Sequence, residues 1–266
     1  MGNPSAAPLP ASKRRPRALA GLVLALGVSS LVVPARAGEV ANVDDARIIE
    51  NGKTGKEWLS NGLDYSANRF SPLDQITAAN VGKLGLAWSY PLDSIRGVEA
   101  TPIVVDGIMY VTAPWAIVYA INAKTGEKIW TFDSQSPRDK GYKLCCDVVN
   151  RGVAVYKGKV YVGTPDARLI ALDAATGKEL WSTNASPENA RPYTITGAPL
   201  VAKGKVFIGG AGADYGVRGV LSAFDAETGK LAWRWYTVPG DPSKPFENEA
   251  MAKAAATWDD TFHYWE

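Results

Sequence analysis

The sequence is poor in the residues that build most metal and nucleophile sites. Its 266 residues include two cysteines and one histidine, His263, which we take to be incidental. No Cys/His metal pattern, Ser/His/Asp arrangement, phosphate-binding loop or C-x-x-C-H haem-attachment motif stands out. Charge of one sign is also scarce, because 29 Lys and Arg face 27 Asp and Glu, for a net charge of +2. With no basic cluster outside the N-terminus, the composition argues against nucleic acid as a partner.

The basic residues that do cluster lie at the N-terminus. Residues 13–17 (KRRPR) precede an apolar run from Ala18 to Val33, and Ala35-Arg36-Ala37 then places small residues where a signal peptidase cuts. The alternative, a membrane anchor, needs about 20 apolar residues and would not end in Ala-x-Ala. We therefore expect residues 1–37 to be a cleavable signal peptide. The mature chain, residues 38–266, is then expected outside the cytoplasm without a membrane span.

An eleven-residue phrase occurs three times, and it predicts the fold. It reads AINAKTGEKIW at 120–130, ALDAATGKELW at 171–181 and AFDAETGKLAW at 223–233, so the copies start 51 and then 52 residues apart. Each copy closes a group of four short β-branched or aromatic runs separated by tight turns. This pattern is typical of the four-stranded antiparallel blades of an all-β propeller. We expect Thr-Gly to form the last turn of each blade, and the closing Trp to cover the next blade.

Other segments are predicted with less repetition to support them. Val43 to Glu50 should form a short helix that stops at Asn51-Gly52, and Leu84 to Tyr90 should form a strand. Trp58 to Leu73 should be irregular, and 248–256 helical. A propeller needs at least four blades to close, so three repeats predict the N-terminal part of a longer protein. The alternative is an open array completed by oligomerisation.

Three polar residues share one position in the repeats. Glu99, Arg151 and Thr196 each stand just before the first strand of a repeat. In a propeller this shared register places an acid, a guanidinium and a hydroxyl at one end of the central channel. Such a cluster suits a polar ligand with carboxylates or carbonyls, which Arg can bind bidentately. The alternative for each residue alone is a surface salt bridge or a turn hydrogen bond.

The third repeat carries an insertion. From the first turn glycine to the Thr-Gly glycine there are 19 residues in the first two repeats and 25 in the third, and the added residues fall in 209–219 (GGAGADYGVRG). An insertion of this kind usually forms a loop on one face, often the binding face. Within it, Asp214 suits a hard cation such as calcium, or it caps its own turn.

The two cysteines, Cys145 and Cys146, are adjacent. An intramolecular disulfide would have to join neighbours, whose Cα atoms lie about 3.8 Å apart across a trans peptide. That separation is below the usual disulfide range of about 4.4–6.8 Å. The residues alone leave three readings open: a strained ring, two free thiols, or bonds to another chain.

Taken together, these motifs resemble one family. CCDVVNRG, TITGAP, GGAGADYGVRG, the three TG-x-x-x-W phrases and WRWYTVPGDPSKPFE are similar to those of the pyrroloquinoline quinone (PQQ)-dependent alcohol dehydrogenases, the methanol/ethanol family, from about Trp58 to the last residue. The resemblance implies an eight-bladed propeller, of which this chain holds about three blades. It implies PQQ in the channel beside a calcium ion, or in some members a lanthanide. It also implies oxidation of small primary alcohols to aldehydes in the periplasm, with a cytochrome c as electron acceptor. Oligomeric state stays open.

The resemblance also assigns roles. It matches Cys145-Cys146 to a vicinal disulfide ring against one face of PQQ. It matches Glu99, Arg151 and Thr196 to polar contacts with the quinone.

The inserted loop is matched in the same way. Gly212 and Ala213 correspond to backbone beside the cofactor, and Asp214 stands where the family usually has a metal-binding Glu, one methylene longer. The family's tryptophan platform and catalytic Asp lie beyond the last residue here, so we expect no catalytic residue in this chain and no turnover by it alone. The competing class is a non-catalytic propeller of similar repeats acting as an assembly or binding scaffold, which would need neither the cysteine pair nor the inserted loop.

Overall fold

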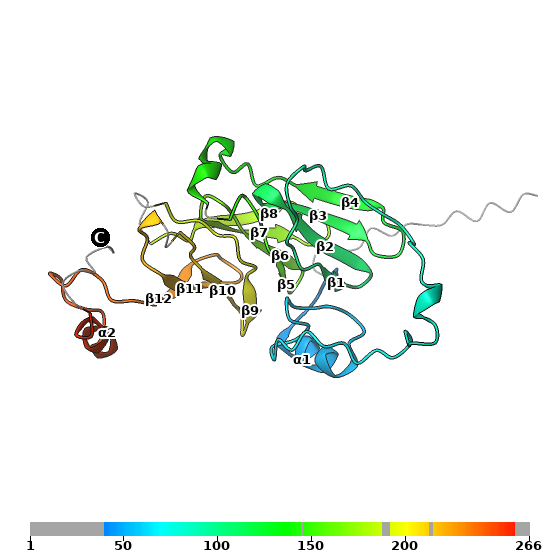
Figure 1. Cartoon of the computed structure of the whole chain (residues 1–266), viewed down its shortest axis with the longest axis horizontal. Helices are drawn as coiled ribbons and strands as arrows, with labels where there is room; N and C mark the ends of the chain where they lie inside the picture. The colour runs from blue at the N-terminus through cyan, green and yellow to red at the C-terminus, as the bar shows by residue number, and fades with distance from the viewer. Residues whose placement is uncertain (1–39, 145, 188–191, 213–214, 259–266) are drawn as a thin grey trace, which may run out of the picture. The chain divides into compact units, whose positions relative to one another are not determined.

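The computed structural model describes residues 40–144, 146–187, 192–212 and 215–258. They form three four-stranded antiparallel sheets, each with its strands in chain order (Figure 1). The first blade contains β1 (Ile103–Val105), β2 (Ile108–Ala113), β3 (Ile117–Asn122) and β4 (Lys128–Phe132). The second contains β5 (Ala154–Tyr156), β6 (Lys159–Gly163), β7 (Arg168–Asp173) and β8 (Glu179–Asn184). The third contains β9 (Leu200–Ala202), β10 (Lys205–Gly209), β11 (Val220–Asp225) and β12 (Leu231–Tyr236). The predicted repeat of three four-stranded blades is confirmed.

The repeated phrase joins one blade to the next. The ring of Trp130, on β4, lies over Gly177 of the second blade, where an added Cβ would come within 2.6 Å of the ring. Trp181, on β8, covers Gly229 of the third blade in the same way, at 2.7 Å. Both glycines also have a positive φ, 71° and 69°, so the turn conformation and the close approach both require glycine. The expected role of the closing Trp is therefore confirmed.

The closing tryptophan of each of the three blades also packs on an aromatic ring of the second strand of its own blade. The ring centroids lie 5.8–5.9 Å apart in the pairs Tyr110–Trp130, Tyr161–Trp181 and Phe207–Trp233. The hydrophobic core follows these contacts. One cluster of buried residues joins the first two blades, and a second joins the second and third.

Trp88, which precedes the first blade, covers the Thr-Gly glycine of that blade in the same way. An added Cβ at Gly126 of the first blade would lie 2.7 Å from the Trp88 ring, and Trp88 Nε1 donates to the Ala123 carbonyl at 3.1 Å. The predicted strand from Leu84 to Tyr90 is nevertheless wrong, because no strand is assigned there. A strand exists only through hydrogen bonds to a neighbouring strand, and none of the three sheets extends to this segment.

Four shorter helices and one longer helix complete the described elements. They are η1 (Val81–Lys83), η2 (Pro114–Ala116), η3 (Arg138–Lys143), α2 (Glu249–Ala255) and α1 (Asp45–Thr54). The predicted helix at 248–256 is confirmed as α2, with Asn248 as its N-cap. Across the part of the chain that the structure describes, no helix has the length and apolar character needed to cross a membrane.

The predicted N-terminal helix is present as α1, but it begins two residues later, at Asp45, and ends later than predicted. It continues through Asn51-Gly52 to Thr54, and Gly55, with φ 60°, forms the C-cap. Gly52 has a different purpose: an added Cβ there would lie 2.1 Å from the Asp64 carboxylate, so the glycine lets the following loop approach the helix. The side chain of Asn51 exchanges hydrogen bonds with the Glu57 backbone at 2.9 and 3.0 Å, which holds the same loop.

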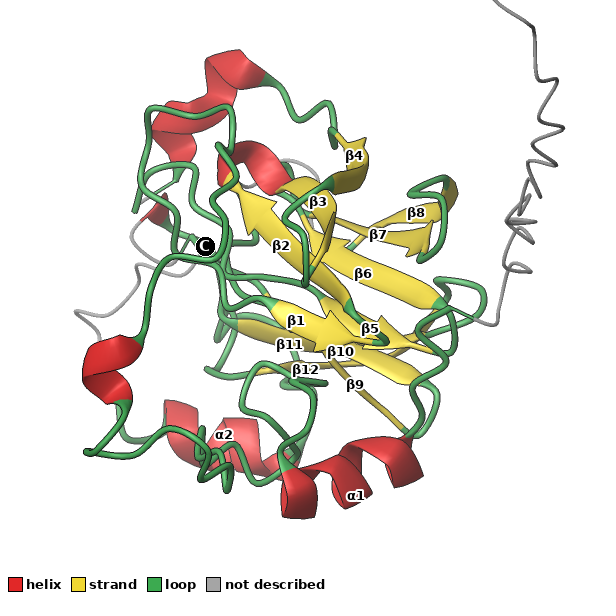
Figure 2. Ribbon diagram, turned by 90° about the vertical axis from the view of Figure 1, so that its right-hand side faces the viewer, coloured by secondary structure: helices red, strands yellow, loops and turns green. Residues whose placement is uncertain are grey.

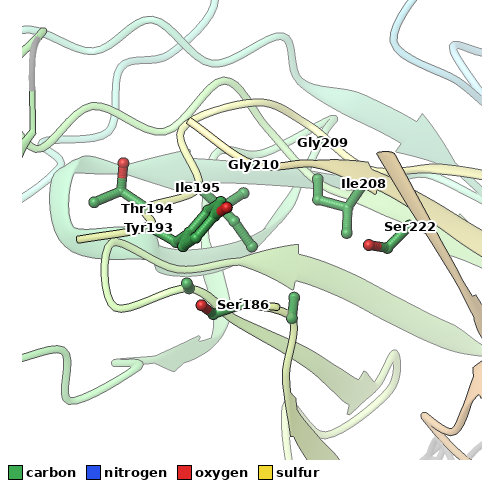
Figure 3. A pocket seen from close by; sticks show the side chains of 10 residues that line it. Ser186, Tyr193, Thr194, Ile195, Ile208, Gly209, Gly210 and Ser222 are labelled. Carbon is green, nitrogen blue, oxygen red and sulfur yellow. The ribbon is translucent and has the colours of Figure 1, made fainter. Parts of the chain in front are cut away.

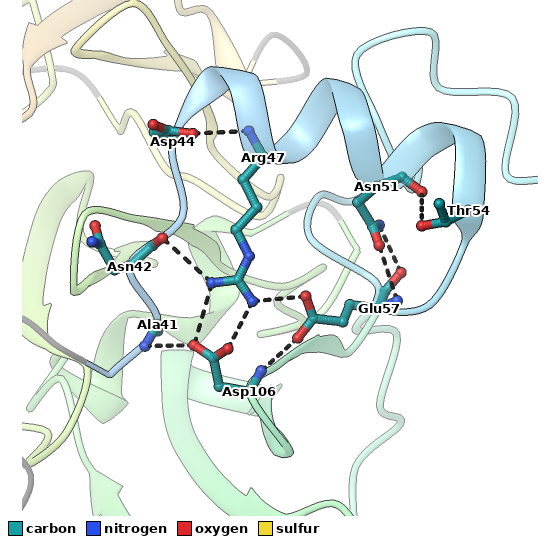
Figure 4. Close-up of polar contacts among 8 residues, drawn as sticks. All are labelled: Ala41, Asn42, Asp44, Arg47, Asn51, Thr54, Glu57 and Asp106. Carbon is teal, nitrogen blue, oxygen red and sulfur yellow. Dashed lines mark hydrogen bonds and ion pairs between the residues drawn. The ribbon is translucent and has the colours of Figure 1, made fainter.

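The segment around α1 is fastened to the first-hairpin turn of the first blade (Figure 4). The Arg47 guanidinium forms ion pairs with Asp106 and Glu57, both at 2.7 Å. Asp106 also accepts a hydrogen bond from the Ala41 amide at 3.1 Å. Because Asp106 stands in the β1–β2 turn, these contacts place α1 at the end of β1 where the strand stops, whereas Glu99 precedes its start. Figure 2 shows α1 beside the sheets.

The carboxylate of Asp45, at the start of α1, attaches the helix to the second and third blades. Asp45 accepts hydrogen bonds from the Tyr156 hydroxyl at 2.7 Å, the Tyr65 hydroxyl at 2.9 Å and the Lys203 amide at 2.8 Å. Burial raises the pKa of Asp45, but these hydrogen bonds outweigh it, and its pKa lies below the ordinary value. Burial, with the neighbouring Asp45 charge, raises the pKa of Tyr156 to about 12. The carboxylate and the neutral phenol are therefore the folded-state forms at neutral pH.

Candidate functional site

The structure brings together the three polar residues that precede the innermost strands. Arg151 lies between the other two: one guanidinium nitrogen is 2.9 Å from the Glu99 carboxylate, and another is 2.8 Å from the Thr196 hydroxyl. The residues come from three different blades, at the ends of β1, β5 and β9 opposite α1. The shared register of the repeats therefore does translate into side-chain contact.

Backbone hydrogen bonds hold these three strand starts at a fixed spacing. The Thr101 amide donates to the Arg151 carbonyl at 3.2 Å, and the Arg151 amide donates to the Thr196 carbonyl at 2.9 Å. Gly152, with φ 127°, allows this close passage, because a Cβ there would lie 2.9 Å from the Thr101 carbonyl oxygen. The backbone therefore fixes Arg151 before any ligand is present.

Glu99 and Arg151 also face open space. Their side chains are 45% and 40% exposed, and an ion pair so exposed contributes only about 0–1 kcal/mol to stability. They border a cavity of about 440 Å³, within the size range of about 300–1,000 Å³ for small-molecule sites. The other wall residues are Ser60, Asn61, Gly62, Asp64, Tyr65, Ala67, Arg69, Thr101, Ala198, Pro199 and Leu200. The arrangement offers a partly free guanidinium to an anionic ligand.

One wall of this cavity was not foreseen from the sequence. Trp58 pairs with Val104 through two backbone hydrogen bonds, at 3.0 and 2.9 Å, so the segment after it runs along the inner edge of the first blade. Leu63, Ala67 and Arg69 have positive φ, 82°, 54° and 53°, conformations that non-glycine residues adopt only when the surroundings impose them. No local pattern could have shown this, because the pairing spans 46 residues.

The cysteine segment directly precedes Arg151 in the chain. Cys146 is exposed, whereas Cys145 lies outside the described residues, so the disulfide stays a prediction. The neighbouring Asp147, with φ 63°, forms an ion pair with Arg96. One residue further on, the carbonyl of Val148 accepts a hydrogen bond from the Trp115 amide at 2.9 Å.

The inserted loop is only partly described. Gly212 has φ 120°, and a Cβ there would lie 2.9 Å from the Pro192 carbonyl, whereas Ala213 and Asp214 lie outside the described residues. The roles predicted for those two residues therefore stay predictions. Among the residues that the structure does describe, no group of three or more His, Cys, Asp or Glu side chains could hold a metal ion.

The end of the loop is held by Arg218. Its guanidinium stacks 3.9 Å from the Tyr236 ring centroid, donates to the Val238 carbonyl at 2.9 Å and pairs with Glu247 at 2.5 Å. The ion pair with Arg218 is the main cause that lowers the pKa of Glu247. The Arg218 side chain is 12% exposed, so this pair is better shielded from solvent than Glu99–Arg151.

A second hollow lies between the inserted loop and the β6–β7 turn (Figure 3). Its walls include Tyr193, Gly210 and Ser222, and its volume is about 10 Å³. This is at the lower limit for one water molecule. The hollow is therefore a packing defect and not a ligand site.

The repeated four-stranded blades, joined by tryptophan–glycine contacts and with polar residues meeting where their first strands begin, define part of a β-propeller. The profile of the PQQ family, described as the glucose/ethanol/alcohol dehydrogenase β-propeller domain, matches residues 58–265. The chain therefore belongs to this family.

Individual relatives are also similar to the chain. It is 60% identical to the quinohemoprotein alcohol dehydrogenase of Comamonas testosteroni, over 86% of this chain and 32% of that protein. The crystal structure of that enzyme superimposes with a TM-score of 0.82, over 86% of this chain and 34% of the other. The 1-butanol dehydrogenase (cytochrome c) of Thauera butanivorans is 56% identical over 77% of this chain and 30% of that protein.

A more distant structural neighbour is a europium-containing methanol dehydrogenase, with a TM-score of 0.69 and 39% identity, over 74% of this chain and 34% of that one. The chain thus spans about a third of the length of the curated relatives it matches.

Proposed function

We propose that this chain is the N-terminal part of a PQQ-dependent alcohol dehydrogenase that oxidises small primary alcohols to aldehydes. The observation that carries the proposal is the contact of Arg151 with Glu99 and Thr196 at one channel end, in a chain 60% identical to a quinohemoprotein alcohol dehydrogenase. The tryptophan–glycine contacts do not distinguish an enzyme from a scaffold, because any propeller built from this repeat would have them. The polar cluster has no comparable structural purpose, because its exposed ion pair adds little stability.

The described residues fit PQQ by their chemistry. PQQ carries carboxylates and quinone carbonyls, which a guanidinium and a hydroxyl can bind, and Arg151 still has free donors on the cavity side. Glu99 and Thr196 hold that guanidinium in place. When bound, PQQ supplies the electron acceptor for alcohol oxidation. The Gly212 backbone would lie beside the cofactor.

The metal and the cysteines complete the proposed site. We propose that Asp214 binds calcium beside PQQ; a lanthanide is the alternative, supported by the europium-containing neighbour. Cys145 and Cys146 would form a vicinal disulfide against one face of the cofactor. A catalytic base would come from a part of the whole protein beyond this chain.

Transport and electron transfer are proposed on the same basis. Residues 1–37 would be removed as a signal peptide, and residues 38–266 would belong to the propeller domain of a periplasmic protein. A cytochrome c would accept the electrons, as the name of the Thauera butanivorans relative gives it for that enzyme.

The direct test is cofactor binding by the whole protein that carries this chain. PQQ is titrated in the presence of Ca²⁺, and the quenching of tryptophan fluorescence gives its dissociation constant. Arg151→Ala should weaken binding about 10- to 100-fold, because a hydrogen bond to a charged group contributes about 1.5–3 kcal/mol. Lys178→Ala, an exposed cation at the opposite end of the second blade, is the matched control and should bind as the unaltered protein does.

Turnover is measured in parallel, with ethanol or 1-butanol and an artificial dye as electron acceptor. The whole protein loaded with PQQ and Ca²⁺ should reduce the dye, and the 266-residue chain alone should not. The proposal fails if the whole protein binds no PQQ, or if Arg151→Ala and Lys178→Ala bind PQQ equally well.

A further inference from the structure

The end of β6 and the turn that follows it, residues 163–167, contact three segments: the residues beside Arg151, the segment that carries Thr196, and the cysteine-bearing loop. We propose that Asp166 in this turn is a positioning residue: it fixes the cysteine-bearing loop of the first blade against the second blade, beside Arg151. The proposal rests on the proposed function, because the site that Asp166 would position is the PQQ site. It adds a residue that neither the repeat pattern nor the resemblance indicates.

The first contact of the turn is with the residues around Arg151. The amide nitrogen of the Asn150 side chain donates to the Gly163 carbonyl at 2.8 Å, and its oxygen accepts from the Gly152 amide at 3.1 Å. Asn150 is 1% exposed. The residues on both sides of Arg151 are therefore anchored to the end of β6.

The second contact is with the segment that carries Thr196. The Ile195 amide donates to the Thr164 carbonyl at 3.2 Å. Ile195 also packs so closely on Gly163 that a Cβ at the glycine would lie 2.2 Å from its side chain. Any displacement of this turn would therefore be transmitted to Thr196, the adjacent residue.

The third contact is made by the Asp166 side chain itself, across to the first blade. Its carboxylate accepts hydrogen bonds from Ser136 Oγ at 3.0 Å, Thr164 Oγ1 at 2.6 Å and Arg168 Nε at 2.8 Å. Arg168 in turn donates to the Ser134 carbonyl at 2.6 Å. Although burial raises the pKa of Asp166, the hydrogen bonds from Arg168, Thr164 and Ser136 bring it below the ordinary value. The carboxylate is therefore charged at neutral pH, and it binds two blades at once.

From Ser134 the contact continues to the cysteine segment. Ser134 Oγ donates to the Trp115 carbonyl at 2.8 Å, and the Trp115 amide donates to the Val148 carbonyl at 2.9 Å. Trp115 has φ 68°, an unfavourable conformation for a bulky residue, and the Arg138 guanidinium lies 4.8 Å from its ring centroid. Residues 133–144 and 146–148 thus pack around Trp115, and Asp166 holds them at one end.

The chain offers a matched control at the other end of β7. The Asp173 carboxylate accepts hydrogen bonds from the Ala175 and Thr176 amides and from the Thr176 hydroxyl, at 2.7–3.1 Å. The Asp173 carboxylate thus accepts as many of these hydrogen bonds as the Asp166 carboxylate does, but all of them come from its own turn. Asp166 reaches Ser136, 30 residues away. Comparing Asp166→Asn with Asp173→Asn therefore distinguishes the loss of a turn hydrogen-bond network, which both variants share, from a change in the position of the site residues, which only Asp166→Asn should cause.

The experiment uses the whole protein that carries this chain, with PQQ and Ca²⁺. Asp166→Asn removes the charge and turns one acceptor oxygen into a donor that faces Arg168 Nε. It should raise the PQQ dissociation constant about tenfold or more, because hydrogen bonds to the charged group are lost. Asp173→Asn should change that constant less than about twofold. Hydrogen exchange without PQQ should become faster in residues 133–151 for Asp166→Asn, and remain unchanged there for Asp173→Asn.

Ser136→Ala is the second variant, in case Asp166→Asn does not fold. It removes one hydrogen bond to Asp166 and no charge, and should weaken PQQ binding a few-fold with faster exchange in the same segment. If the unaltered protein binds no PQQ, the proposed function fails. If it does bind PQQ, and the Asp166 and Ser136 variants match Asp173→Asn in both measurements, the positioning role is refuted.

Discussion

The contact between Trp130 and Gly177 allows a sharp test of what joins one blade to the next. In Gly177→Ala the new Cβ would lie 2.6 Å from the indole ring, so the ring has to move. Trp130 is 8% exposed and donates to the Ala174 carbonyl at 3.0 Å, and both its packing and this hydrogen bond would be disturbed. Overpacking costs about 1–3 kcal/mol, and the hydrogen bond contributes about 0.5–1.5 kcal/mol.

The backbone adds a cost that a control can subtract. Gly177 has φ 71°, where an alanine costs about 1–2 kcal/mol. Gly204 has nearly the same φ, 70°, but nothing within 4 Å of an added Cβ. Gly204→Ala should therefore lower the free energy of unfolding by about 1–2 kcal/mol and Gly177→Ala by about 3–5 kcal/mol. Urea denaturation of the 266-residue chain, followed by tryptophan fluorescence, measures both. Equal losses would refute the idea that the ring–glycine contact stabilises the blade junction.

Three further predictions concern other contacts. Asp45→Asn should lower the free energy of unfolding by about 1.5–3 kcal/mol at pH 7. Because the pKa of Asp45 is depressed in the folded state, the stability difference between the variant and the unaltered chain should shrink as the pH falls below about 4. Urea denaturation across pH 3–7 measures this difference. Trp130→Phe should cost about 1–2 kcal/mol more than Trp233→Phe in the same assay, since Trp233 is 42% exposed, and equal costs would contradict this. Arg218→Lys should lower the thermal midpoint by a few degrees, because Lys cannot hold Glu247 bidentately, and an unchanged midpoint would count against that role.

The repeat could be predicted because its signals are local. Each Thr-Gly turn and closing Trp lies within eleven residues, and the first hairpin turns are two-residue turns such as Asp106-Gly107, with φ 51° and 74°. The meeting of Glu99, Arg151 and Thr196 followed from their common place in that repeat. What the residues do once they meet depends on a ligand, and remains a proposal.

The errors and omissions have a common physical cause, which is that contacts between distant residues decide the local outcome. Gly52 looks like a helix stop, but it is tolerated within α1 because Asp64 needs the space. Leu84 to Tyr90 has strand-like residues but no partner strand. Asp166 looks like an ordinary turn residue, and only the fold shows that Ser136 of another blade bonds to it.

The attachment of α1 also bears on the order in which the chain folds. Its contacts join residues 65, 111 and 158 positions apart, through Asp106, Tyr156 and Lys203 in turn. Closing the longest of these loops costs about 0.8 kcal/mol more entropy than closing the shortest. The helix is synthesised first, yet it cannot complete its contacts until all three blades have emerged. During synthesis, docking of the helix is therefore completed only after the third blade has formed.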